Sequence, residues 1–324
     1  MSITPESMVV RSVISPGAVG AAIESDYSLG RVLDCQLHAV NLNEHYELLT
    51  SQGKYFVRLY GRCAYWASTK SELSFELEYL LFLAGAGIPV STPVARKDNQ
   101  LLGQLLTPEG LRFYAVFTFA VGRQNYPPSI DESARLGKYV GQIHKATVGY
   151  DSRHSRIEYN LEQLLDDSIQ RICKFLGSER SEHQAFLVKL GKELKRAELP
   201  KTPEFFGVIG GGFLGTNHHV TDAGDITLFQ FDFCGYGWRI YELAHFLWHA
   251  KLYHAPLEIW DAFLGGYQSV RVLSAMELNR IDAFVKIKHI FTMGYHTTYA
   301  NWMGDCSFDD FYWDKHFEPL KTWS

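Results

Sequence analysis

The sequence has few cysteines, and they lie far apart along the chain. There are five among 324 residues, and no two of them form a close pair. Disulfide scaffolds and zinc sites require cysteines at paired, short spacings, so neither class fits this chain. The pattern predicts reduced thiols in a cytoplasmic protein. The five positions are Cys35, Cys63, Cys173, Cys234 and Cys306.

Long apolar runs and an excess of basic residues are also missing. No run reaches the roughly 18 apolar residues that a membrane helix needs, and the N-terminus lacks the basic-then-apolar pattern of a secretory signal. The net charge is -5 and the isoelectric point is about 6.2, whereas a nucleic-acid-binding surface needs a basic stripe. We therefore expect neither a membrane nor a nucleic acid as a partner.

Apolar and aromatic residues are abundant. The chain is 46% hydrophobic and 14% aromatic, which is enough to bury a large core. Its length allows one large domain or two lobes of ordinary size. No internal repeat or low-complexity tract interrupts it.

The first third of the chain predicts a small sheet that carries one helix. A short helix is expected near 17–25 and antiparallel strands within 32–60, where β-branched and aromatic residues flank a turn at 51–53. A helix is expected over 69–86, because leucines recur at helical spacing before Gly85, Gly87 and Pro89. Further strands are expected over 88–97, 100–108 and 111–122.

The rest of the chain predicts mostly helices, with a lobe boundary at residue 118. Helices are expected near 130–148, 160–176, 180–197, 239–253, 256–270 and 275–300, followed by an aromatic tail over 302–317. The predicted parts are an N-terminal arm (1–25), an N-terminal lobe (26–118) and a helical C-terminal lobe (119–324). The pattern indicates an α+β, two-lobed, kinase-like architecture.

A predicted hairpin over 206–235 brings two oxygen-bearing side chains together. Four glycines precede Asn217, a turn is expected at Ala223-Gly224, and the second strand ends at Asp232. An amide and a carboxylate at the mouth of a hairpin suit Mg²⁺, which takes few protein ligands and keeps its other positions for waters and phosphates. The hairpin is therefore a candidate magnesium site.

Arg58 lies in the middle of a predicted strand with apolar neighbours. It is either a surface residue of an edge strand or a cation that reaches phosphates in a cleft. Three acids of the following helix, Glu72, Glu76 and Glu78, are candidate partners for it.

Two histidines, His245 and His249, share a face of the helix predicted over 239–253. An i, i+4 pair can hold a transition metal. The large apolar residues between them favour core or substrate-wall histidines instead. The aromatic tail allows two readings as well, the lining of an acceptor pocket or packing within the core.

At this point the sequence resembles a known family. Residues 229–248 (FQFDFCGYGWRIYELAHFLW), together with 210–217 (GGGFLGTN), are similar to the aminoglycoside phosphotransferase and choline kinase group. Shorter stretches at 55–60, 76–94, 116–123 and 134–147 are similar to the same family. The resemblance implies the protein-kinase-like fold, with ATP or another nucleoside triphosphate and Mg²⁺ as cofactors.

The resemblance also implies roles for individual residues. Asp232 and Asn217 would bind the metal, Arg58 would contact the α- and β-phosphates, and Glu76 would orient Arg58. Two further segments complete the implied nucleotide site. Asn43 and Glu44 would form the turn above the nucleotide, and the backbone from Thr118 to Ala120 would meet the adenine edge.

The chain departs from the family motif in the loop before Asn217. The motif His-Gly-Asp-x-His-x-x-Asn places its first histidine at Gly210, its catalytic aspartate at Gly212 and its second histidine at Leu214. No proton-handling side chain remains in these positions. The nearest substitutes are His218 and His219. Two positions after the loop differ as well, because Gln230 and Glu242 stand where the family has aspartate.

These departures leave open what the chain does. The first hypothesis is a pseudokinase-like protein that binds nucleotide or a small ligand, or that acts through a protein partner. The second is a slow or unusual ATP-dependent phosphotransferase acting on a hydroxyl or amino group of a small metabolite or a peptide. A third, nucleotidyl transfer with the nucleotide reversed, has no feature of its own in the sequence.

Overall fold

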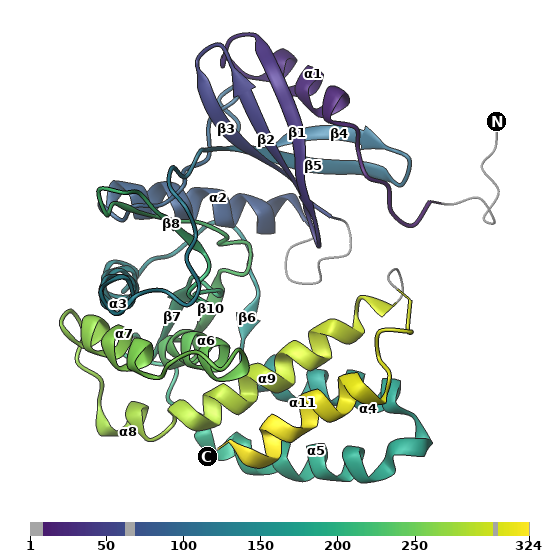
Figure 1. Cartoon of the computed structure of the whole chain (residues 1–324), viewed down its shortest axis with the longest axis vertical. Helices are drawn as coiled ribbons and strands as arrows, with labels where there is room; N and C mark the ends of the chain where they lie inside the picture. The colour runs from purple at the N-terminus through teal and green to yellow at the C-terminus, as the bar shows by residue number, and fades with distance from the viewer. Residues whose placement is uncertain (1–8, 62–68, 301–303, 324) are drawn as a thin grey trace. The chain divides into compact units, whose positions relative to one another are not determined.

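The computed structural model describes residues 9–61, 69–300 and 304–323, which form two compact units (Figure 1). Unit 1 comprises Met1–Arg123, Ser152–Ile157 and His218–Asp232. Unit 2 comprises Gln124–Asp151, Glu158–Asn217 and Phe233–Ser324. None of the helices among the described residues is both long and apolar enough to cross a membrane.

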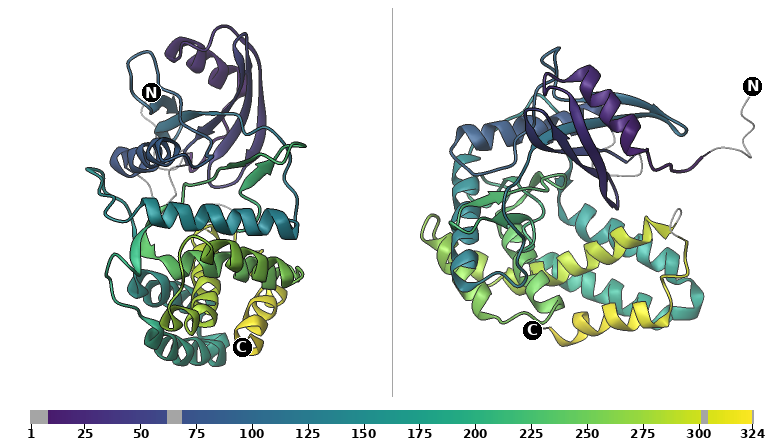
Figure 2. Two further views of the ribbon diagram at one scale, coloured as in Figure 1. Left: turned by 90° about the vertical axis from the view of Figure 1, so that its left-hand side faces the viewer. Right: turned by 45° about the horizontal axis from the view of Figure 1, so that its top comes forward.

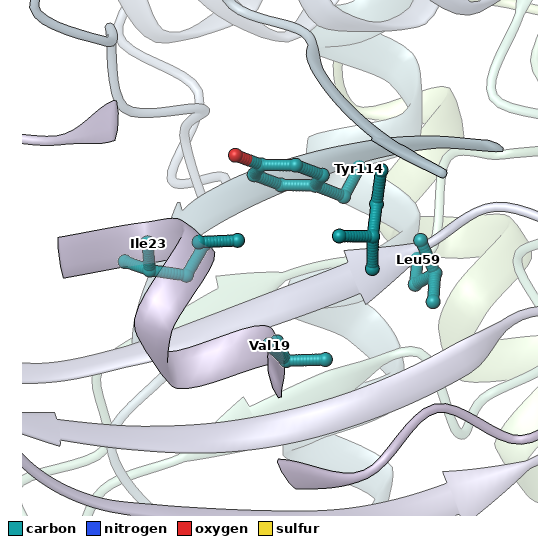
Figure 3. Close-up of a pocket in the computed structure, with 6 residues that line it drawn as sticks. Val19, Ile23, Leu59 and Tyr114 are labelled. Atoms are coloured by element: carbon teal, nitrogen blue, oxygen red, sulfur yellow. The ribbon is translucent and has the colours of Figure 1, made fainter. Parts of the chain in front are cut away.

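Unit 1 is built on a five-stranded antiparallel sheet with the order β1-β2-β3-β5-β4. The strands are β1 (Val32–Val40), β2 (Glu44–Thr50), β3 (Gly53–Leu59), β4 (Gly103–Thr107) and β5 (Gly110–Thr118). Helix α1 (Pro16–Asp26) lies beside β1 in both views of Figure 2. Its Val19 and Ile23 face Leu59 and Tyr114 across a small apolar space (Figure 3). Helix α1 thereby covers one side of the sheet.

Helix α2 (Lys70–Gly85) follows β3 in the chain and carries the acid that matters for the site. Its start is fixed by a capping box, in which Thr69 accepts from the Glu72 N–H and Glu72 accepts from the Thr69 N–H. Leu73, Leu77 and other apolar residues are buried, and Glu76 is fully buried among them.

The hairpin part of the predicted stretch is present, and its residues His218–Asp232 belong to unit 1. Strands β8 (His218–Val220) and β9 (Ile226–Leu228) pair around a turn in which Gly224 N–H donates to Thr221 O. The strand alternation ends at Gln230, whose φ of 63° lies in the left-handed region. Phe231 is therefore buried directly after an exposed Gln230, and Asp232 follows at the end of the arm.

The strand predicted over 88–97 is wrong. Only isolated bridges occur there, from Val90 to Leu228 and from Pro93 to Phe117. The prolines at 89 and 93 have no N–H to donate to a ladder. The segment instead docks the hairpin, because Leu228 N–H donates to Pro89 O and Ser91 N–H donates to Leu228 O, at 2.7 and 2.8 Å.

Unit 2 is mostly helical around a small sheet with the order β6-β10-β7. Strand β10 pairs with β6 in parallel and with β7 in antiparallel register. The glycine and aromatic composition of these short strands (FGVI and GYGW) gave no strand signal in the sequence. They are β6 (Glu158–Tyr159), β7 (Phe206–Ile209) and β10 (Gly235–Trp238).

The helices of unit 2 follow the predicted ranges, with two exceptions. The helix predicted over 275–300 is two helices, interrupted at Asn279 and Arg280, and the C-terminal part of the aromatic tail is helical because Asp309 caps it at Tyr312 N–H. The helices are α3 (Ile130–Ala146), a π-helical turn (Glu162–Asp166) continuing into α4 (Asp167–Leu176), α5 (Ser181–Leu194), α6 (Arg239–Leu252), α7 (Glu258–Gln268), α8 (Ala275–Leu278), α9 (Ile281–Thr297) and α11 (Asp310–Thr322). Short 3₁₀ turns span Ser178–Arg180 and Lys195–Ala197.

The two units do not follow the predicted parts 1–25, 26–118 and 119–324. Residues 9–25 of the arm group with the sheet, and residues 119–123, 152–157 and 218–232 group with unit 1 as well. The hairpin and the segment 152–157 reach unit 1 through contacts far apart in the sequence, which a linear division of the chain leaves out.

Candidate functional site

A buried ion pair joins the sheet and the helix of unit 1. Arg58 in β3 and Glu76 in α2 are 5% and 0% exposed, and Arg58 Nη1 lies 2.5 Å from Glu76 Oε1. This is the pairing expected from the resemblance, and it selects Glu76 among the three acids considered. The Arg58 side chain also lies over the rings of Tyr60 and Phe117.

The charges around this pair favour a permanent guanidinium. Burial alone lowers the pKa of Arg58, but the carboxylates of Glu76 and Asp232 outweigh it, and the pKa is raised. Burial raises the pKa of Glu76; Arg58 opposes that shift and Asp232 adds to it. Arg58, Glu76 and Asp232 are therefore coupled within one cluster of unit 1.

Asn43 and Asp232 are brought together in the same cluster. Asn43 Nδ2 donates to Asp232 Oδ2 at 3.2 Å, and Asn43 Oδ1 accepts from Gly61 N–H at 3.0 Å. Asn43 is buried and Asp232 is partly exposed. The predicted turn residue Asn43 thus orients the predicted metal ligand, and its contact with a nucleotide stays a prediction.

Arg156 is a member of this cluster that the sequence analysis missed. Its Nη1 donates to Glu72 O at 2.7 Å, Nη2 donates to Asp232 O, and the guanidinium lies over the Phe75 ring. Arg156 thereby ties the first turn of α2 to the backbone of Asp232. Its segment, Ser152–Ile157, is distant from both in the sequence, so no local pattern indicated it.

Glu44, the other predicted turn residue, is fully buried in a separate network. Its carboxylate accepts from Arg112 Nη1 and the Tyr46 hydroxyl at 2.6 Å, and from Ile14 N–H at 2.9 Å. These bonds hold the N-terminal arm and β5 together. The structure therefore gives Glu44 a structural role, and its predicted contact with a nucleotide stays a prediction.

The predicted adenine-binding backbone, Thr118 to Ala120, is partly engaged within unit 1. Thr118 N–H donates to Thr92 O at 2.9 Å, and Thr118 O accepts from the Ser91 hydroxyl at 2.6 Å. His219 Nδ1 lies 2.7 Å from Ala120 O. The Ala120 N–H has no hydrogen-bond acceptor among the residues that the structure describes, so it is the free donor at this edge.

The two histidines proposed as substitutes for the missing base are held by other contacts or buried. His219 contacts the Ala120 carbonyl and packs edge-on against the Phe229 ring. His218 is 1% exposed in β8. Neither arrangement presents a free imidazole for proton transfer. The role of both as bases stays a prediction.

The glycine-rich loop lies in unit 2 and is held through its backbone. Gly210 N–H and Gly211 N–H donate to the two carboxylate oxygens of Glu242, at 2.9 and 2.6 Å. Asn217 Nδ2 donates to Gly212 O, and its amide oxygen accepts from the Thr216 hydroxyl at 3.3 Å. The loop is therefore anchored without any acid or base of its own.

Glu242 belongs to a buried chain of polar side chains that supports the loop. His144 Nε2 lies 2.9 Å from Glu242 Oε2, and His144 Nδ1 lies 2.9 Å from the Tyr267 hydroxyl. That hydroxyl accepts from Arg271, which pairs with Glu277 at 2.7 Å. Glutamate reaches both loop amides and His144 at once, which explains its use at this position.

A family model described as phosphotransferase enzyme family (APH) matches residues 35–273, more than half of the chain. The chain belongs to this family. The predicted recognition of the aminoglycoside phosphotransferase and choline kinase group is thereby confirmed.

Individual relatives show how far the likeness extends. An uncharacterized protein of Synechocystis sp. is 28% identical over 289 residues, covering 89% of this chain and 79% of the relative. A homoserine kinase of Burkholderia lata is 26% identical over 252 residues, covering 72% and 71%. The solved structure of the amicoumacin kinase hAmiN with AMP-PNP, Ca²⁺ and Ami has a TM-score of 0.72 at 20% identity, covering 89% and 88%. The α+β protein-kinase-like fold predicted from the sequence is confirmed.

In this phosphotransferase family member, the residues expected to hold a metal have suitable donor atoms. Among the described residues, Asp232 accepts one side-chain hydrogen bond, and Asn217 Oδ1 accepts one from Thr216 at 3.3 Å. Carboxylate and amide oxygens are the ligands of Mg²⁺. Asp232 lies in unit 1 and Asn217 in unit 2, and their pairing stays a prediction.

In the part of the chain that the structure describes, no group of three His, Cys, Asp or Glu side chains could hold a metal ion. His245 and His249 are both buried on α6. Of the two readings, the one that places them in the interior of unit 2 is confirmed.

The buried histidines of unit 2 make its stability depend on pH. The pKa of His144 is lowered to about 4, because burial disfavours the imidazolium more than Glu242 favours it. Five other histidines of this unit have lowered pKa values for the same reason: His245, His249, His289, His296 and His316.

Acidification is therefore expected to destabilise unit 2. Since the folded pKa lies below the unfolded value of about 6.5, the stabilisation is complete above that pH and is lost as the pH falls towards 4. Each such histidine costs about 1–2 kcal/mol at pH 5. Urea unfolding between pH 7.5 and 5 measures this loss of stability. The slope of the free energy of unfolding against pH should correspond to an uptake of several protons on unfolding. An uptake below one proton would show that the histidines are not buried as neutral groups.

Proposed function

We propose that this phosphotransferase family member binds a nucleoside triphosphate with Mg²⁺ through unit 1, and performs ordinary hydroxyl phosphorylation weakly or not at all. The observation that carries the proposal is a contrast. The coupled cluster of Arg58, Glu76 and Asp232 is complete, whereas the loop from Gly210 to Leu214 has no side chain that can accept a proton.

The donors of unit 1 support a nucleotide. Arg58 is a buried cation whose Nε has no acceptor among the described residues, and phosphate oxygens would supply acceptors for it. Ala120 N–H is a free donor at the expected adenine edge. The related structure of hAmiN contains AMP-PNP, which is a nucleotide analogue.

The oxygen donors support a hard cation. Asp232 would hold Mg²⁺, with Asn217 as a second ligand. The bound cation would neutralise charge on the phosphates during transfer. Within the protein, Asn43 and Arg156 orient Asp232, one through its carboxylate and one through its carbonyl. Asp232 is thus fixed from two sides by residues of its own unit.

The loop of unit 2 supports weak catalysis. A positioned general base contributes typically about 10²–10⁴-fold to a rate. Gly212 occupies the position of that base in the family motif, and Glu242 is occupied with the amides of Gly210 and Gly211. Phosphoryl transfer depends mainly on positioning and electrostatic stabilisation. Loss of the base therefore slows the reaction without abolishing it.

A second candidate function follows from that last point. The chain would be a slow phosphotransferase for a hydroxyl or amino group of a small metabolite or a peptide. The complete ion pair of Arg58 and Glu76 favours it, because an idle site gains nothing from a buried charge pair. Homoserine kinase among the relatives makes a small-molecule acceptor the more plausible class.

The test is thermal unfolding with ATP, in the presence and absence of Mg²⁺. Mg·ATP at 100 times its dissociation constant is expected to stabilise the protein by about 2.7 kcal/mol. Asp232→Ala should remove the Mg²⁺-dependent part. Asp222→Ala is the matched control, since it removes an exposed carboxylate from the turn of the same hairpin. An equal response of wild type and Asp232→Ala would exclude Asp232 as the metal ligand.

A further inference from the structure

Lys288 is a buried cation in the interior of unit 2. It lies in α9, which packs against α6, and it is 9% exposed. Its Nζ is 5.4 Å from the ring centroids of both Trp248 and Phe291. The ammonium thus lies over two aromatic faces, which attract a cation weakly compared with a carboxylate.

Lys288 differs from the buried cations Arg58 and Arg112 in having no acid beside it among the described residues. No carboxylate lies within ion-pair distance of its Nζ among residues 9–61, 69–300 and 304–323. Arg58, by contrast, pairs with Glu76 and Arg112 pairs with Glu44. A buried charge without a partner is costly, and proteins seldom keep one without a use for it.

Two imidazoles near Lys288 also lack hydrogen-bond partners. His245 is 1% exposed, and within the described chain neither of its ring nitrogens has a partner. His249, one turn further along α6, has none at Nδ1. The buried His144, by contrast, contacts Glu242 and Tyr267 through its two ring nitrogens. Three ring nitrogens without a described partner therefore lie on α6, the helix that packs against the helix of Lys288.

The described groups whose pKa Lys288 shifts are imidazoles. Burial lowers the pKa of His245, His249 and His296, and Lys288 lowers each of them further, so these imidazoles are neutral. His289 on α9 and His316 on α11 are buried and neutral as well. Burial also lowers the pKa of Lys288, to about 7. Lys288 and these histidines supply hydrogen-bond donors, and none of them is an anion.

We propose that unit 2 binds a small carboxylate at Lys288, between α6 and α9, with its apolar part against Trp248 and Phe291. One ammonium balances one carboxylate charge, whereas a phosphate dianion would leave a net negative charge in an apolar wall. His245 and His249 supply further donors to the carboxylate oxygens. This site is separate from the proposed nucleotide function and does not depend on it.

The experiment uses thermal unfolding of the full chain with phenylacetate and acetate, their neutral amides, and inorganic phosphate. The carboxylates are expected to raise the melting temperature, and the amides and phosphate are not. Lys288→Met should melt at a higher temperature without ligand, because a buried unpaired charge is removed. Its affinity for phenylacetate should fall at least about 30-fold. Lys286→Met, a partly exposed lysine of the same helix, is the matched control and should behave as wild type.

A second measurement detects the proton that Lys288 takes up when a carboxylate binds. At pH 8.5 Lys288 is largely neutral, and pairing with a carboxylate requires the ammonium. Calorimetric titration in two buffers of different ionisation enthalpy should therefore show an uptake of about one proton by wild type and none by Lys288→Met. The proposal fails if no carboxylate of the series binds, if amides bind equally well, or if Lys288→Met retains the affinity.

Discussion

Gly212→Asp is expected to raise ATP-dependent phosphorylation by about 10²–10⁴-fold, the usual contribution of a positioned general base. The position is that of the catalytic aspartate in the family motif. The loop around it is already held by Glu242 at Gly210 and Gly211 and by Asn217 at Gly212 O. A carboxylate added there would therefore enter a loop whose backbone is fixed.

The rate is measured as consumption of labelled ATP, with water and a panel of hydroxyl and amino acceptors. Gly212→Asn is the matched control, because it adds a side chain of the same size without a base. The second motif position is harder to restore, since a Cβ at Gly210 would lie 2.6 Å from the Phe213 ring. If the aspartate variant is no faster than the asparagine variant, loss of the base does not explain a low rate.

Removing Glu76 is expected to cost about 3–5 kcal/mol of the free energy of unfolding, since Arg58 would remain buried without a counter-charge. The pair is almost completely buried, with Nη1 and Oε1 2.5 Å apart. The double change Arg58→Met with Glu76→Leu removes both charges and should recover most of the loss. Its stability would then resemble that of wild type while nucleotide binding is lost.

Urea unfolding of the two single variants and the double variant measures the coupling between these residues. Glu78→Leu is the control on the same helix. Glu78 pairs with the exposed Arg153 at 2.6 Å, and such surface pairs contribute about 0–1 kcal/mol. A cost for Glu76→Leu that is no larger than that for Glu78→Leu would mean that the Arg58 charge is solvated in solution.

The parts of the site that are coded locally were predictable from sequence. Turn chemistry between two short apolar runs indicated the hairpin at Ala223-Gly224, and the alternation around Arg58 placed it within a strand. The leucine periodicity of the next helix made Glu72, Glu76 and Glu78 candidate partners of Arg58, and the resemblance singled out Glu76. In each case the signal lies within a few residues of the feature.

The parts that depend on distant contacts were not predictable. Arg156 reaches Glu72 O and Asp232 O from a segment that has no strand or helix pattern. Glu44 looked like a turn residue, yet Arg112 and Tyr46 bury its carboxylate. Single-sequence patterns describe neighbours along the chain, and the bonds of Arg156 and Arg112 join residues tens of positions apart.

The short elements of unit 2 were missed for another reason. Strands β7 and β10 have four residues each and include glycines, so they have no alternation to detect. The helix α11 was hidden within an aromatic tail, because its only clear signal is the cap at Asp309. Pairing and packing within unit 2 override weak local propensity here.

The most direct test of the central claim, a working nucleotide site in unit 1 together with a loop without a base in unit 2, is calorimetric titration of the wild-type chain with AMP-PNP, with Mg²⁺ and with EDTA. The analogue resists hydrolysis, so the result does not depend on turnover. We expect saturable binding with Mg²⁺ and at least tenfold weaker binding with EDTA, because the charges of Asp232 and the phosphates need the cation between them. No binding under either condition would contradict the account.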